Sequence, residues 1–426
     1  MAEIRPFKGI RFNPLKIQNM ANVITPPYDV IDTREQNRLH ELDPHNIIRL
    51  EYGLIKDGDN EQYNRYTRAA DTLKRWLSDD VLRMDSSAGY YLYEQEFVFN
   101  NRKMKRPGII AALKLEPYNR KTVLPHELTM KGPKEDRLAL LNTIRSNISP
   151  IFTLFPDPED FMSSLFKYAK PEGALFEARE NSGQIHRLWQ VQEPAVIKEI
   201  TKYFQERQLL IADGHHRYET ALHYSQTKAR TGGDGGSSFV LSTMVSMQDE
   251  GLLALPTQRL LKGIEKEEEK ELMARLQEHF TINESGNLAG LDLDKFREEL
   301  KNIGTGKGGF GLFCSGKAFL IRPKFDLRRG DLAISLLHKY VLDINGESAG
   351  DSSEKETALS MSFEHDPAKC LEEVKNGNAD WAFILDAVPV EKIFERSKMG
   401  LVMPRKSTYF YPKLPGGLVL YHMDLS

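Results

Sequence analysis

The chain has 426 residues, with 58 Lys and Arg against 61 Asp and Glu, for a formal net charge of −3. This length predicts two domains, and the balanced charge argues against a basic nucleic-acid-binding surface. The two cysteines form no metal-ligand spacing. The N-terminus has no leader pattern, and no apolar run approaches the ~18 residues that span a bilayer. We therefore expect a cytoplasmic protein without a membrane partner.

Helix and strand patterns alternate from the beginning of the chain. The paired prolines at 26–27 exclude a helix there. Asn60 is expected to cap an amphipathic helix, in which apolar residues recur at helical spacing: Tyr63, Tyr66, Ala70, Leu73 and Leu77. Residues 89–99 and 108–115 are rich in strand formers, and the polar segment 100–107 between them predicts a β-hairpin.

The alternation continues through the rest of the chain. Further elements are expected as a helix from about Glu135, a strand at 151–155, a hairpin at 175–189, a helix near 194–206, a flexible connection or lid at 231–238, a strand that ends at 255–259, a charged helix after 262, a hairpin at 310–321, a helix at 331–342 and a β-α-β-α run at 361–398. This pattern predicts a mixed α/β (α+β) protein with domains at 1–260 and 261–426.

Residues 208–224 are the most informative stretch, because an apolar strand pattern breaks at Asp213-Gly214 and passes directly into a helical pattern. Gly214 allows a backbone conformation that a side chain would forbid. The N–H groups that open the helix favour an anion. Arg217 can bind a phosphate through two nitrogens, and His215 and His216 lie in the same turn. We therefore expect a phosphate-binding turn, with an ordinary capped surface helix as the alternative.

A metal ion has two candidate sites in this pattern. Asp213 is positioned to hold Mg²⁺ against the phosphates, since Mg²⁺ favours one or two carboxylates with phosphate oxygens. In the alternative interpretation, Asp213 only shapes the turn or caps the helix. A zinc or iron site made by His215 and His216 with His126 and Glu127 is less favoured, because adjacent histidines point in different directions.

Glu127 is the first candidate for a general base. A carboxylate placed against a hydroxyl proton can accept it, and the neighbouring His126 can orient that carboxylate or hold a phosphate oxygen. The alternative is a loop residue that caps the following helix.

The tail at 403–418 mixes basic and aromatic residues between two prolines, which suits a segment that closes over a nucleotide. Lys406 and Tyr409 are the candidates there, and Arg259 is a third candidate for nucleotide contact. An ordinary closing strand is the alternative. Three further polar residues in apolar or Pro-rich surroundings are weaker candidates: Asp29, Asn46 and Arg49.

Two of these motifs together resemble the ParB/sulfiredoxin-like superfamily, and within it the free L-serine kinases. The motifs are Pro-His-Glu at 125–127 and Asp-Gly-His-His-Arg at 213–217. The resemblance implies a nucleotide-binding core in the first ~260 residues, with Glu127 as base and 213–217 on the phosphates. Over nearly its whole length, the chain also resembles a widespread prokaryotic family of unknown function, through RPFKGIR, PPYD, PHE, DGHHRYET and MPRKSTYFYPK.

One departure from the kinases concerns the spacing of the motifs. In the compact serine kinases the two motifs lie much closer together, whereas about ninety residues separate them here, so the substrate does not follow from the resemblance. We expect a kinase that uses ATP or ADP with Mg²⁺ to phosphorylate a small hydroxyl compound, with free L-serine first. The competing hypothesis is a nucleotide-responsive regulator without kinase activity.

Overall fold

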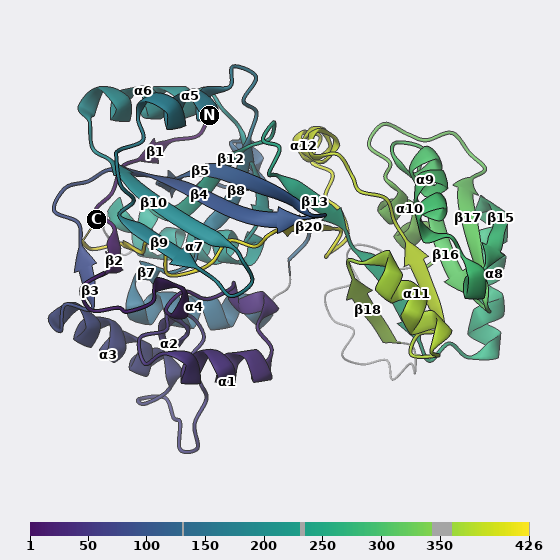
Figure 1. Ribbon diagram of the computed structural model, residues 1–426, viewed down its shortest axis with the longest axis horizontal. Helices are drawn as coiled ribbons and strands as arrows, with labels where there is room; N and C mark the ends of the chain where they lie inside the picture. The colour runs from purple at the N-terminus through teal and green to yellow at the C-terminus, as the bar shows by residue number, and fades with distance from the viewer. Residues whose placement is uncertain (130–131, 231–234, 343–359, 426) are drawn as a thin grey trace. The chain divides into compact units, whose positions relative to one another are not determined.

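The computed structural model describes residues 1–129, 132–230, 235–342 and 360–425, and it confirms the mixed α/β class (Figure 1). The chain forms two compact units. The first contains residues 1–125, 130–253 and 412–426, and the second contains residues 126–129 and 254–411. The division into domains at 260 stays a prediction. Apart from residues 126–129, the second unit is formed by residues 254–411, and the chain belongs to the first unit again from residue 412.

The first unit is built on a nine-stranded mixed sheet with the order β6-β11-β8-β12-β5-β4-β10-β9, and β1 also pairs with β5. Its strands are β1 (Ile4–Arg5), β4 (Tyr90–Phe99), β5 (Arg102–Lys114), β6 (Val123–Leu124), β8 (Ile151–Phe155), β9 (Phe176–Arg179), β10 (Ile185–Val191), β11 (Leu209–Asp213) and β12 (Phe239–Ser246). The β6–β11 and β8–β12 pairs are parallel, and the other pairs are antiparallel. Every residue of β8 and β12 is buried, as expected for strands covered on both faces.

Helices cover both faces of this sheet. Figure 1 shows α5 and α6 on one face and α7 with α1 to α4 on the other. The bounds are α1 (Thr33–Leu42), α2 (Ile48–Glu51), α3 (Arg65–Ser78), α4 (Gly132–Ile144), α5 (Phe161–Tyr168), α6 (Pro194–Phe204) and α7 (His215–Arg230). Two small sheets pair β2 (Ile10–Phe12) with β3 (Leu82–Met84) and β7 (Ser146–Asn147) with β21 (Tyr421–His422). Trp76, Leu140 and Leu420 join these small sheets and helices in one apolar core.

The second unit contains a six-stranded antiparallel sheet with the order β15-β17-β16-β19-β14-β18. Its strands are β14 (Gln258–Lys262), β15 (Phe280–Asn287), β16 (Phe310–Cys314), β17 (Lys317–Pro323), β18 (Ser360–Glu364) and β19 (Trp381–Ile384). The helices are α8 (Lys266–His279), α9 (Leu293–Gly304), α10 (Ala333–Tyr340), α11 (Pro367–Lys375) and α12 (Val390–Lys398). Phe296 of α9 and Cys370 of α11 pack with Phe313 in the core. β13 (Leu253–Pro256) and β20 (Thr408–Tyr411) form a separate two-stranded sheet.

Three local predictions are corrected. The cap of α3 is Asn64, whose side chain accepts hydrogen bonds from the first turn, whereas Asn60 holds the turn before it. The polar segment 100–107 is mostly strand: Asn100 and Asn101 alone make the hairpin turn, because both adopt the positive φ that a tight turn requires. Residues 255–259 do not end β12 but contribute to β13 and β14. The predicted lid lies partly outside the described residues, at 231–234.

The central strand β5 gives a test of this core. Leu113 is fully buried there, so Leu113→Ala is expected to lower the free energy of unfolding by about 2–5 kcal/mol through lost burial and a cavity. Urea denaturation of the purified variant measures this loss. The exposed residue Lys103 of the same strand supplies the control, and Lys103→Ala is expected to change stability by no more than about 0.5 kcal/mol. Equal effects of the two substitutions would contradict the placement of β5 at the centre.

Candidate functional site

The start of α7 has the geometry expected of a phosphate-binding turn. β11 ends at Asp213, Gly214 has a φ of +91°, and α7 begins at His215. A Cβ on Gly214 would lie 3.1 Å from the guanidinium of Arg217, so both the conformation and the close approach favour glycine. The first N–H groups of a helix have no partner within it, and the positive end of the helix dipole lies at the same place. This turn therefore suits an anion.

A cluster of ion pairs surrounds Asp213. Its Oδ2 accepts a hydrogen bond from Arg217 Nη2 at 2.7 Å, and its Oδ1 accepts one from Lys413 Nζ. Arg217 also donates through Nη1 to the carbonyl of Pro150. The three charged side chains are only 11–14% exposed. Burial raises the pKa of Asp213, but Lys413 and Arg217 outweigh it, so the pKa of this carboxyl lies below its ordinary value.

A second carboxylate, Asp29, belongs to the same cluster. It lies in the short 3-10 helix η2 (Tyr28–Val30) that the Pro-Pro-Tyr-Asp motif forms. Desolvation by the surrounding protein raises the pKa of Asp29, and the charge of Asp213 raises it further, while Arg217 and Lys413 lower it. Two carboxylates thus share two cations. Such an arrangement can take up a proton or a cation when an anionic ligand draws Arg217 and Lys413 away.

The histidines of the turn differ in exposure. His215 is buried and His216 is half-buried. The charge of His215 is among the influences that lower the pKa of Asp213, which places this imidazole close to the carboxylate.

In the second unit, Glu127 is held by a tight loop. Its Oε1 accepts hydrogen bonds from the backbone N–H groups of Ser407 at 3.0 Å and Thr408 at 3.1 Å, and from the Thr408 hydroxyl. Its Oε2 accepts from the N–H of Lys406 at 3.1 Å. His126 Nε2 lies 2.8 Å from the Thr408 hydroxyl. The loop therefore engages both carboxylate oxygens.

Arg259 binds the backbone carbonyls of this loop. Its guanidinium donates to the carbonyls of Lys406 at 3.0 Å, Arg405 at 3.1 Å and Thr257 at 2.6 Å, and its Nε contacts His338 at 3.3 Å. Burial lowers the pKa of Arg259 to about 10, against the opposite influence of Glu127. Burial and the charge of Arg259 lower the pKa of His338 to about 3, so this imidazole is neutral.

The two tail candidates contact aromatic rings within the second unit. The ring of Tyr409 stacks on His365 with centroids 4.0 Å apart, and Lys406 Nζ lies 4.9 Å from the ring centroid of Phe363. Lys406 is exposed and has a φ of +53°.

The predicted site residues thus fall into two groups. Residues 213–217 lie in the first unit, whereas the other candidates lie in the second: His126, Glu127, Arg259, Lys406 and Tyr409. Sequence reasoning missed Lys413 as the partner of Asp213, although the residue lies inside the tail that the sequence had singled out. Asn46 and Arg49 are structural, because their side chains hold backbone carbonyls of Asn22 and His40.

The described residues contain no group of three His, Cys, Asp or Glu side chains that could hold a metal ion, which leaves the zinc or iron hypothesis without a ligand set there. None of the helices in the described ranges is both long and apolar enough to cross a membrane.

The chain belongs to the family described as "Protein of unknown function (DUF1015)", which matches residues 4–344 and so confirms that part of the resemblance. No curated protein matches the chain.

Among solved structures, a conserved hypothetical protein from Pyrococcus furiosus is 16% identical, with a TM-score of 0.38 over 75% of this chain and 97% of that chain. A free serine kinase in complex with AMP is 14% identical, with a TM-score of 0.41 over 75% and 93%. SbnI from Staphylococcus aureus is 11% identical, with a TM-score of 0.34 over 71% and 84%. At such low TM-scores we infer neither a shared fold nor a shared activity.

The ion cluster predicts a pH-dependent contribution to stability. The pKa of Asp213 lies below its ordinary value of 3.8. The charged carboxylate therefore stabilises the fold above pH 3.8, and this stabilisation is lost as the pH falls through the lowered pKa. Asp213→Asn is therefore expected to cost about 2 kcal/mol in the free energy of unfolding at pH 7. The difference from the wild type should shrink below pH 4, as measured by urea denaturation at several pH values.

The exposed carboxylate of Asp57 provides the matched control. Asp57→Asn should leave stability unchanged at every pH tested. A constant difference in the free energy of unfolding between wild type and Asp213→Asn across the whole pH range would argue against the ion cluster.

Proposed function

We propose that the protein is a small-molecule kinase that transfers a phosphoryl group from ATP or ADP to a hydroxyl, with free L-serine as the first acceptor to test. The observation that supports this most is the glycine turn before α7, where Arg217 and Lys413 converge on Asp213. In the reaction, the acceptor oxygen forms a bond to phosphorus and loses its proton. The bond from phosphorus to the nucleotide's bridging oxygen breaks, and its electron pair stays with the nucleotide.

Positioning and charge neutralisation dominate phosphoryl transfer, so the protein needs few reactive groups. In the proposal, Gly214 allows the phosphates to approach the backbone, and the N–H groups of His215 and His216 donate to them. Arg217 and Lys413 exchange part of their interaction with Asp213 for the phosphate oxygens. The low exposure of these ions strengthens that interaction.

The proposal includes a magnesium ion that Asp213 and Asp29 would hold. The carboxylates of Asp213 and Asp29 fit the preference of Mg²⁺ for one or two carboxylates together with phosphate oxygens. Both oxygens of Asp213 are paired with cations, so these residues suit the metal when phosphates engage Arg217 and Lys413. The ion would supply further neutralisation of phosphate charge.

Glu127 is the proposed proton acceptor. A base must offer a lone pair to the hydroxyl, whereas both oxygens of Glu127 accept hydrogen bonds from residues 406–408. Because each carboxylate oxygen carries two lone pairs, the proposal requires that one of them face the acceptor hydroxyl while the loop holds the carboxylate. Arg259 fits a supporting role in this step, because it holds the carbonyls of the same loop.

The second candidate function is a nucleotide-responsive regulator. The engagement of Glu127 by the loop favours it, because a purely structural carboxylate would be held in the same way. In both cases we propose a cytoplasmic protein, in which Cys314 and Cys370 stay free as buried thiols.

Incubation of the purified protein with Mg²⁺, L-serine and either ATP or ADP separates the two functions. Mass spectrometry should detect O-phosphoserine with at least one donor. Tight nucleotide binding without phosphorylation of any small hydroxyl compound would reject the kinase and support the regulator.

Glu127→Gln tests the proposed base. Turnover should fall by about 10²-fold or more, because a positioned base contributes that much, while the dissociation constant for the nucleotide should stay within about twofold. Steady-state kinetics and calorimetry measure the two quantities, and a melting curve checks that the loop still folds. The exposed Glu391 supplies the control substitution Glu391→Gln. Equal loss of turnover and nucleotide affinity, or unchanged turnover, would reject the assignment.

A further inference from the structure

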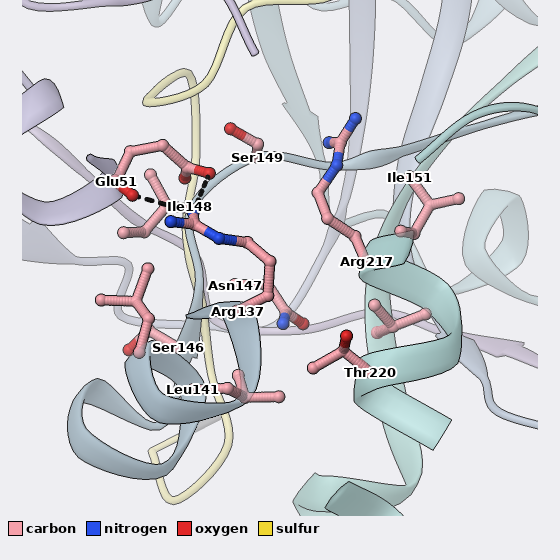
Figure 2. Close-up of a pocket in the computed structure, with 12 residues that line it drawn as sticks. Glu51, Arg137, Leu141, Ser146, Asn147, Ile148, Ser149, Ile151, Arg217 and Thr220 are labelled. Carbon is pink, nitrogen blue, oxygen red and sulfur yellow. Dashed lines mark hydrogen bonds and ion pairs between the residues drawn. The ribbon is translucent and has the colours of Figure 1, made fainter. Parts of the chain in front are cut away.

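The two cations of the phosphate-binding turn are held in different ways. Arg217 lies in the first turn of α7, where a regular helix fixes its backbone (Figure 2). Lys413 lies in the stretch 412–415, which belongs to neither a helix nor a strand. Pro412 and Pro415 carry no N–H group and cannot donate to a ladder of backbone hydrogen bonds. The position of Lys413 therefore depends on contacts of another kind.

Two buried side chains hold the backbone on both sides of Lys413. Arg106 Nη2 donates to the carbonyl of Pro412 at 2.5 Å, and Gln95 Nε2 donates to the carbonyl of Lys413 at 3.2 Å. These carbonyls belong to the two peptide groups that flank the Cα of Lys413. Because each peptide group is planar, holding both of them restrains the direction in which the Lys413 side chain leaves the backbone. The Nζ at its end binds Asp213.

Gln95 and Arg106 also bind each other, and we call this pair the Gln95–Arg106 clamp. They are directly opposite residues of β4 and β5, both are 0% exposed, and Arg106 Nη2 donates to Gln95 Oε1. The Gln95 amide also donates to Gln184 Oε1 at 3.0 Å, in the turn between β9 and β10. The amide thus uses its oxygen and donates to two acceptors, which leaves it a single orientation.

The guanidinium of Arg106 suits the task of holding a carbonyl. Burial lowers the pKa of Arg106 to about 10, so the group still carries its charge at neutral pH, and charged donors form stronger hydrogen bonds than neutral ones. Its planar set of donors lets one nitrogen bind both Gln95 and the carbonyl of Pro412. Its Cζ lies 4.9 Å from the ring centroid of Phe152 in β8. The large sheet therefore fixes the clamp independently of the stretch 412–415.

We propose that Gln95 and Arg106 are positioning residues of the phosphate-binding turn, which hold Lys413 where its Nζ can bind a nucleotide phosphate. This inference rests on the proposed function and adds that the affinity for a nucleotide depends on two side chains that act through Lys413. A lysine side chain is a flexible four-carbon stem. A fixed backbone reduces the conformational freedom that Lys413 loses when it binds the phosphate.

A double-mutant cycle tests whether Gln95 acts through Lys413. The variants are Gln95→Met, Lys413→Met and the combination of the two, and calorimetry on the full chain measures the dissociation constant for ADP with Mg²⁺. Lys413→Met should weaken ADP binding by about tenfold or more, since a charged hydrogen bond is lost. Gln95→Met should weaken it by about three- to tenfold in the wild-type background, because a misplaced side chain loses less than an absent one. In the Lys413→Met background, Gln95→Met should have no effect.

A second variant, Gln95→Met with Arg106→Met, removes both partners of the buried hydrogen bond and leaves no buried guanidinium behind. Such paired replacements by apolar groups of similar shape cost little stability. Melting curves should therefore show a folded protein, whereas ADP binding should weaken by about three- to tenfold. Gln190 supplies the matched control, since its amide binds the carbonyl of Ser87 at 3.0 Å from the neighbouring strand β10. Gln190→Met should leave ADP binding unchanged.

Unchanged ADP affinity in Gln95→Met would overturn the positioning role, while a loss of affinity in Lys413→Met would still support the phosphate-binding turn. An equal weakening by Gln95→Met in both backgrounds, or loss of folding in both clamp variants, would assign the clamp to the fold alone and also overturn the positioning role. Unchanged ADP affinity in Lys413→Met would reject the turn and the positioning role together. The predicted coupling without formation of O-phosphoserine would reject the kinase but retain the positioning role.

Discussion

The interaction on which the candidate site depends is the pairing of Asp213 with Arg217 and Lys413. It connects the end of β11, the first turn of α7 and a residue 200 positions further along the chain. Burial of ions is costly, and an apolar replacement of such a cluster is often neutral or stabilising. In the proposed function, the charges of this cluster at the helix N-terminus serve to bind the phosphates of a nucleotide.

A second constraint operates in the other unit, where residues 406–408 enclose the carboxylate of Glu127. Arg259 fixes the carbonyl side of this loop, and the N–H side faces the carboxylate. The position of Glu127 thus depends on a loop nearly 280 residues away in the sequence. The same contacts therefore fit a catalytic base and a carboxylate that only holds the loop. A measurement of kinase activity distinguishes these two roles of Glu127.

Local patterns predicted the elements well, because strand and helix periodicity and turn residues act over short distances. β11 with α7, the hairpin β9–β10 and the strand β8 were predicted close to their observed bounds. The hairpin β4–β5 was predicted, but its connection was expected at 100–107 instead of at Asn100-Asn101, because Lys and Arg on an exposed strand resemble a loop. The partners Lys413 of Asp213 and 406–408 of Glu127 could not be predicted, since long-range contacts leave no periodic signal in one sequence.

A crystal structure of the protein with ADP and Mg²⁺ tests the central claim most directly. Our account predicts nucleotide phosphates on the N–H groups of residues 214–217, with Arg217 and Lys413 turned from Asp213 toward the phosphate oxygens. A nucleotide bound elsewhere, with the Asp213 ion pairs unchanged, would contradict it.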